Sequence, residues 1–107
     1  MAVNIFRNIK GDLTTSGSTL YTTPLGYSGI ILMAQVSNLT GNTIATSMSV
    51  ISGATQTSLV TNFEIPAQDA AGTLTGKLVL QPGEQLFASA SANSVAQIVL
   101  SVLESQN

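Results

Sequence analysis

The sequence contains no cysteine and no histidine. Without cysteine the chain can form no disulfide and has no thiolate nucleophile, and most structural zinc sites are excluded. Without histidine it lacks the commonest general base and metal ligand of proteins. Serine and threonine are abundant, but a nucleophile needs a positioned base, and the eight charged residues are scattered along the chain. These absences predict a protein that is not an enzyme, and we expect no cofactor.

Charge is also scarce, at 7% of residues against about 25% in a typical soluble domain. The cations are Arg7, Lys10 and Lys77, and the net charge is −2. Three cations cannot neutralise several phosphates, and nucleic acid is therefore not an expected partner. Glu64 and Asp69 could meet across a loop, but calcium usually takes more carboxylates and its characteristic acidic loop is missing. No metal site is expected.

Long apolar segments are absent as well. The longest apolar run covers residues 29–34, far short of the roughly 20 residues that span a bilayer. The opening MAVNIFRNIK has no apolar region of signal-peptide length. We therefore expect no membrane association, and synthesis in a cytoplasm.

Neutral polar residues replace the missing charges, since 40 residues are Ser, Thr, Asn or Gln. A hydroxyl or amide that finds a hydrogen-bond partner costs little to desolvate, whereas burying an unpaired ion costs several kcal/mol. Such a surface is suited to extensive contact with other protein. The alternative is a soluble domain that merely carries little charge.

Eight β-like segments, rich in apolar or alternating residues, are separated by Gly, Pro, Asn and Ser. They cover residues 3–9, 19–23, 28–38, 43–51, 57–65, 73–80, 85–91 and 95–104. This spacing predicts an all-β fold, a single antiparallel β-sandwich of about eight strands in a jelly-roll-like or Ig-like arrangement. Segments 28–38 and 95–104 are apolar on both faces, so we expect them to lie centrally in their sheets.

One domain is expected overall. Residues 1–18 form an N-terminal β segment and loop that could contact a partner, and residues 19–107 form the sandwich body.

Several residues are candidates for a subunit interface. Ile5 and Phe6 are neighbours in one strand, so one of them must face away from the other, and Val3 belongs to the same apolar segment. Ala88 and Ala90 make a small-residue face that would allow close approach. Tyr21 and Tyr27 flank the turn at Pro24 and are expected to be partly exposed, which leaves a carbohydrate-binding module as an alternative. Phe63 and Phe87 are expected to fill the core.

Two stretches, LYTTPLGYSGIILMAQVSNLTGNTIATSMSV and LVLQPGEQLFASASANSVAQIVLSVLE, resemble small β-sandwich virion proteins of tailed bacteriophages, including phages of cyanobacteria. The shared features are a Y-T-x-P-x-G turn, an N-x-T-G-x hairpin, an I-P strand end, an L-x-P-G-[DE] turn and a last strand ending in L-E. The sequence departs from the family pattern at Tyr27 and in the longer link at residues 68–72, both of them in loops.

The resemblance implies a viral structural protein of the virion, made in the host cytoplasm. It favours a capsid decoration or cement protein, with a tail, neck or fibre-attachment component as the alternative. The implied partners are the chain itself, as a homotrimer or ring, and the major capsid protein or tail proteins.

Overall fold

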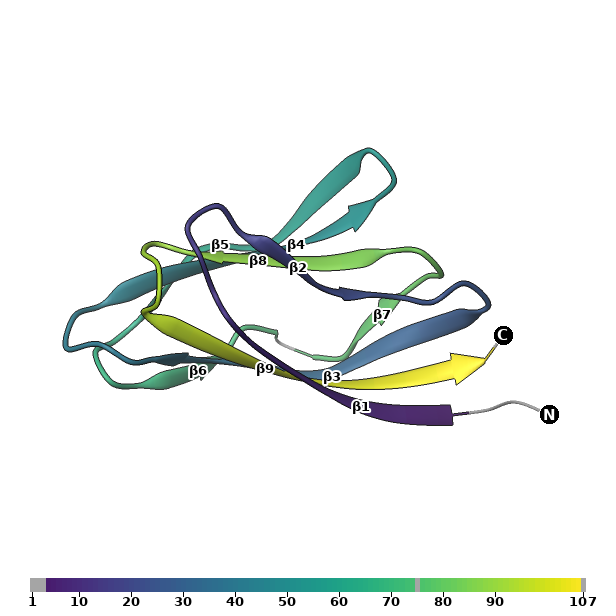
Figure 1. The fold of residues 1–107 in the computed structure, drawn as a ribbon, viewed down its shortest axis with the longest axis horizontal. Helices are drawn as coiled ribbons and strands as arrows, with labels where there is room; N and C mark the ends of the chain where they lie inside the picture. Colours follow the sequence, from purple (N-terminus) through teal and green to yellow (C-terminus); the bar gives the residue numbers. More distant parts are fainter. Residues whose placement is uncertain (1–3, 75, 107) are drawn as a thin grey trace.

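The computed structural model describes residues 4–74 and 76–106 as nine strands in two antiparallel sheets, with no helix among these residues. The five-stranded sheet contains β1 (Asn4–Asp12), β9 (Ala96–Gln106), β3 (Tyr27–Asn38), β6 (Ala70–Gly72) and β7 (Leu78–Leu80). The four-stranded sheet contains β2 (Ser18–Thr22), β8 (Gln85–Ala90), β4 (Ile44–Ser52) and β5 (Thr55–Ile65). Figure 1 shows the two sheets stacked as layers. The expected all-β antiparallel sandwich is confirmed.

The strands pair as one long ribbon that has been rolled up. β4 pairs with β5, β3 with β6 and β7, β2 with β8, and β1 with β9. Rolling then places β9 beside β3 and β8 beside β4, which gives the orders β1-β9-β3-β6 and β2-β8-β4-β5. These orders are those of a jelly roll, which is built from nested Greek keys. They decide between the two arrangements that the sequence left open.

The strand expected at residues 73–80 is shorter than predicted. Only Leu78–Leu80 is a strand, and the link before it contains β6. β6 pairs with residues 35–37 of β3 and β7 with residues 29–31, so the break lies opposite a register shift between Ile31 and Met33. An extra residue at such a β-bulge bends the strand and interrupts its ladder. The bulge therefore divides one jelly-roll strand into two.

The N-terminal segment belongs to the sandwich. All nine residues of β1 pair with β9, so the strand continues to Asp12 rather than ending at Ile9. Leu13 follows it and is fully buried, and its backbone N–H donates to the carbonyl of Ala96 at 3.0 Å.

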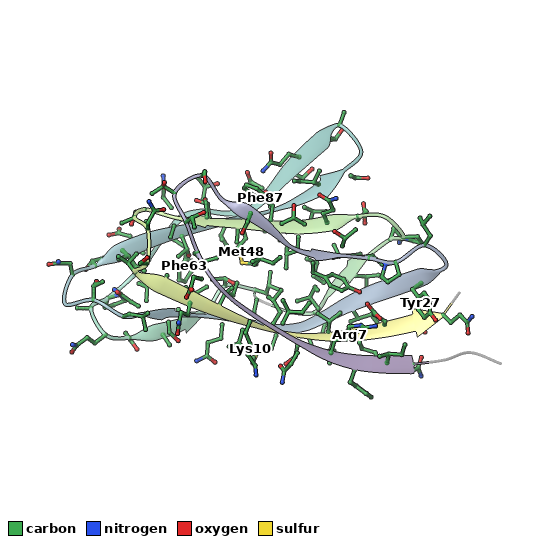
Figure 2. All side chains as sticks on the ribbon, in the orientation of Figure 1. Arg7, Lys10, Tyr27, Met48, Phe63 and Phe87 are labelled. Atoms are coloured by element: carbon green, nitrogen blue, oxygen red, sulfur yellow. The ribbon has the colours of Figure 1, made fainter. Side chains whose placement is uncertain are left out.

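The core lies between the sheets and follows from strand alternation. On β9, Ala96, Ile98, Leu100 and Val102 are all buried, as a period of two requires. β9 lies between β1 and β3, and β3 lies between β9 and the β6 and β7 pair, so both expected central strands are confirmed. Figure 2 shows Met48 and Phe63 between the two layers, which agrees with the expected core position of Phe63.

Candidate interaction surfaces

An apolar row crosses the outer face of the five-stranded sheet. Residues directly opposite each other on antiparallel strands project on the same face. Phe6 lies opposite Leu103, Leu103 opposite Ile30, and Ile30 opposite Val79. The next row inward along the strands contains Val102 and Ile31, which face the core with 1% and 0% exposure. The Phe6 row must therefore face outward, and Phe6 is 75% exposed.

The bulge on β3 enlarges this row. The pairing shifts between Ile31 and Met33, so Leu32 and Met33 together occupy the place opposite Ser101. Both side chains are exposed, at 36% and 39%. We call the Phe6 row, together with Leu32 and Met33, the apolar patch. It holds four of the six exposed large hydrophobic residues among those that the structure describes, namely Phe6, Leu32, Met33 and Val79.

A hollow of about 440 Å³ opens beside the patch. It is lined by Phe6, Arg7, Asn8, Leu32, Ser101 and Val102. The lining contains no carboxylate that could serve as a base for Ser101, and the one charged group is Arg7. Apart from Arg7 the lining is apolar or neutral, which suits contact with another surface.

An ionic cluster lies on the inner side of β1, with a buried carboxylate and a half-exposed guanidinium. Glu104 is 2% exposed, its Oε1 accepts a hydrogen bond from Arg7 Nε at 2.8 Å, and its Oε2 accepts one from the Tyr21 hydroxyl at 2.6 Å. Gly29 lies opposite Glu104 on β3, and a Cβ there would come within 2.9 Å of the Tyr21 ring. Glycine therefore makes the room in which Tyr21 reaches the carboxylate. The cluster ties β1 and β2 to β9.

The cluster shifts the pKa values of its members. Burial alone would raise the pKa of Glu104, but hydrogen bonds from Tyr21 and Arg7 and the charge of Arg7 outweigh burial and lower it. Burial raises the pKa of Tyr21, and the bond to the Glu104 carboxylate raises it further. The hydrogen bond and the charge of Glu104 raise the pKa of Arg7. At neutral pH the cluster is one carboxylate between one guanidinium and one neutral phenol.

The outer face of the four-stranded sheet is lined mainly by hydroxyls and amides. Gln56 Nε2 donates to Ser49 Oγ at 2.6 Å, and the backbone N–H of Asn62 donates to Ser47 Oγ at 3.0 Å. Ser47, Ser49 and Gln56 border a hollow of about 160 Å³ that is also lined by Phe87.

Phe87 was expected in the core and lies instead on this outer face, as Figure 2 shows. Its neighbours Leu86 and Ala88 are fully buried, so alternation turns Phe87 outward. The loop before β2 packs on the ring, because a Cβ on Gly17 would lie 2.3 Å from Phe87 Cζ. Gly17 has a φ of 79°, which favours glycine in any case.

The predicted interface residues fall in three groups. Val3 lies outside the described residues. Phe6 is exposed, and Ile5 and Tyr27 are half-buried. Tyr21, Ala88 and Ala90 are buried by this chain's own core. The expected partial exposure of Tyr21 is therefore wrong, and the alanine face packs inside the sandwich. The interface role of Ile5, Phe6 and Tyr27 stays a prediction.

Sequence reasoning missed Leu32, Met33, Ile30, Leu103 and Val79 as surface residues. The continuous apolar run on β3 predicts a central strand, but it does not say which face of that strand is left uncovered by the rest of the chain. In the structure, one of its faces is the core face and the other is the apolar patch. The apolar run itself is the signal for this surface. A strand that is apolar on both faces needs both faces covered, but a domain of this size has one core, which covers only one of them.

Within residues 4–74 and 76–106, no three His, Cys, Asp or Glu side chains are grouped as a metal site. Over the same residues, no helix is long and apolar enough to cross a membrane.

A scan against protein-family models and a search of curated proteins gave no match. Among solved structures, the chain is similar to a protein of the T13 viral particle of infectious bursal disease virus (IBDV), with a TM-score of 0.56 and 7% identity over 95% of this chain and 30% of that one. For the VP2 subviral particle of infectious bursal disease virus the TM-score is 0.50 at 8% identity, covering 98% of this chain and 32% of that one.

A protein of Bacillus endospore appendages, disulfide-linked pili, gives a TM-score of 0.49 at 9% identity over 99% of this chain and 88% of that chain. The chain spans under a third of each of the two infectious bursal disease virus proteins. At these identities, the likeness to the viral proteins shows a shared fold.

Proposed function

We propose that the protein is a non-enzymatic structural protein of a virion, and specifically a decoration or cement subunit on the capsid of a tailed bacteriophage. The observation that carries the proposal is the apolar patch, which lies on the outer face of a sandwich whose fold is shared with proteins of an icosahedral virus. Contiguous exposed apolar surface marks interaction sites on soluble proteins.

The composition of the patch supports a protein partner. None of its six residues is charged, and charged residues are depleted at the centres of protein interfaces. Desolvating such a surface leaves no unpaired ion. Its partners would be other copies of the chain and the major capsid protein. A subunit of this kind would be made in the host cytoplasm and end in the virion.

Two alternatives use the same fold differently. A tail, neck or fibre-attachment component would bury the same patch but would be present in few copies. A carbohydrate-binding module needs exposed aromatic platforms, and the burial of Tyr21 removes one of the two that the sequence offered.

The proposal is tested by quantitative mass spectrometry of purified particles of the phage that encodes the chain. A decoration subunit is expected in hundreds of copies per particle, and Val79→Asp should reduce its incorporation strongly. Ser58→Asp is the matched control, because it adds the same charge at an exposed residue of β5 in the other sheet. A few copies per particle would favour the tail, and absence from particles would contradict the virion role.

A further inference from the structure

The two sheets have four edges, and three of them are protected against pairing with another chain. β2 has five residues and a register shift. β5 has two register shifts against β4, and its Asn62 has a φ of 51°. β6 and β7 are two three-residue strands with a break between them. Short strands and bulges are the devices by which soluble proteins blunt exposed edges.

The fourth edge, β1, is neither short nor bulged, although it carries the charged side chains of Arg7, Lys10 and Asp12. Its register with β9 is unbroken from Asn4 opposite Ser105 to Asp12 opposite Gln97. It contains no proline, and six of its nine residues are exposed. β1 is the last strand in its sheet order, and in Figure 1 it lies along the rim of the sandwich with β9 on its other side. Half of its backbone N–H and C=O groups must therefore point away from β9.

We propose that this edge pairs with β1 of a second copy of the chain, antiparallel across a two-fold axis at Asn8. The midpoint of Asn4–Asp12 is Asn8, so only this register pairs all nine residues of both strands. A two-fold interface is self-complementary by symmetry, and two identical long edges without a bulge meet that condition.

The charges on β1 favour this register over its neighbours. With Asn8 opposite Asn8 of the partner subunit, Phe6 lies opposite Lys10 of the partner subunit, and no like charges face each other. A shift of two residues in one direction would place Arg7 opposite Arg7 of the partner subunit, which is unfavourable. A shift of two residues in either direction also shortens the ladder. In the favoured register the aliphatic stem of the lysine can cover the Phe6 ring and the ammonium can lie over it.

The pairing deepens the proposed function without depending on it. It would join two five-stranded sheets into one continuous sheet and bring both apolar patches onto the same face. Such a dimer would offer a partner lattice two equivalent contacts, so that binding of the second patch becomes intramolecular.

The chain contains no cysteine, so single-cysteine variants report the register directly. Opposite residues of antiparallel strands have Cα atoms about 4.5–5.5 Å apart, within disulfide range. Asn8→Cys should therefore become mostly cross-linked dimer under mild oxidation. Lys10→Cys is the matched control on the same strand and face. In this register its two copies are offset by four residues, roughly 13 Å, and should stay largely uncross-linked.

A charge exchange gives an independent measurement by light scattering coupled to size exclusion. Wild type should be a dimer, Asn8→Lys and Asn8→Asp should each be monomers with unchanged circular dichroism, and their mixture should be a dimer again. Gln35→Lys, an exposed residue of the central strand β3 on the same face, should remain a dimer.

A wild-type monomer, or a trimer unaffected by Asn8→Lys, would overturn the pairing. Loss of the dimer in Gln35→Lys together with its retention in Asn8→Lys would also overturn the pairing, because it would indicate that two copies pack through the face of the sheet. If the chain dimerises as expected but is absent from purified particles, the pairing is supported and the virion role is contradicted.

Discussion

The two sheets pack on one core, but their outer faces differ in polarity. The outer face of the four-stranded sheet is lined mainly by hydroxyls and amides, whereas that of the five-stranded sheet carries the apolar patch. The four-stranded sheet follows the ordinary rule, with Leu86 and Met48 inside and the hydroxyls of Ser47 and Ser49 turned away from the core. At one end of the five-stranded sheet the rule is inverted. β1 turns Arg7 inward to the buried Glu104 and turns Phe6 outward to solvent.

The inversion on β1 is the pattern that the proposed interface would require. The ion pair joins a buried carboxylate to a half-exposed guanidinium, so desolvation of the carboxylate offsets much of its attraction, and an exposed phenylalanine contributes little burial. Both features make sense if the outer face of this sheet is covered and the ion pair fixes β1 in the position that presents it. The outer face of the four-stranded sheet is mainly polar and needs no such cover.

The role of the ionic cluster on the inner side of β1 is tested by a substitution at Glu104. We expect Glu104→Gln to lower the free energy of unfolding by about 1–3 kcal/mol at pH 7, because the amide removes the counter-charge of Arg7 and offers one acceptor oxygen where the carboxylate offers two. Urea denaturation at several pH values measures this. Glu64→Gln, at an exposed site on β5, should change stability by less than about 0.5 kcal/mol.

The pH dependence of this effect has a definite sign. The pKa of Glu104 is lowered in the folded protein from its ordinary 4.5, so its stabilisation is complete above that value. It is lost as pH falls through the lower, folded-state pKa. The stabilities of wild type and Glu104→Gln should therefore converge in acid. A constant difference down to the lowest pH would show that the carboxylate charge is not involved.

On the four-stranded sheet, the packing of Phe87 is tested by Gly17→Ala. We expect a loss of about 1–2 kcal/mol from the left-handed backbone, with a further loss because the new Cβ would displace the Phe87 ring. Gly26→Ala is the control, since Gly26 has a φ of 83° but no atom within 4 Å of a Cβ. Equal losses in thermal unfolding would show that the Phe87 contact contributes nothing.

The smallest effect on stability is expected on the apolar patch. Phe6→Ala should change the free energy of unfolding by less than about 0.5 kcal/mol, because the side chain is 75% exposed. Leu100→Ala, on the fully buried side of the same sheet, should cost about 2–5 kcal/mol. A comparable cost at both sites, measured by denaturation of the dilute chain, would place Phe6 in the monomer core instead.

Local patterns predicted much of the fold. The apolar alternation of residues 95–104 identified a central strand, and Pro82-Gly83 predicted the turn before β8, where Gly83 has a φ of 84°. Both signals depend on neighbours in sequence. The general class of sandwich followed from the spacing of such segments.

The features that were missed depend on residues far apart in the chain. Arg7 and Glu104 are 97 residues apart, and no local pattern pairs them. The outward position of Phe87 depends on Gly17, and the surface position of Met33 depends on a bulge set by pairing with β9. A periodic segment shows that a strand has two faces, but the partner strands decide which face meets the core.

The nested ribbon also has a kinetic consequence. β4 and β5 are joined by a tight turn, whereas the ladder between β1 and β9 closes a loop of nearly the whole chain. Closing long loops carries a larger entropic cost, and folds rich in such contacts form slowly. We expect the central hairpin to form early and β1 to dock last. The edge of β1 and the outward Phe6 would then reach their final positions only after the rest of the sandwich has folded. Association through them would therefore begin only after folding is complete.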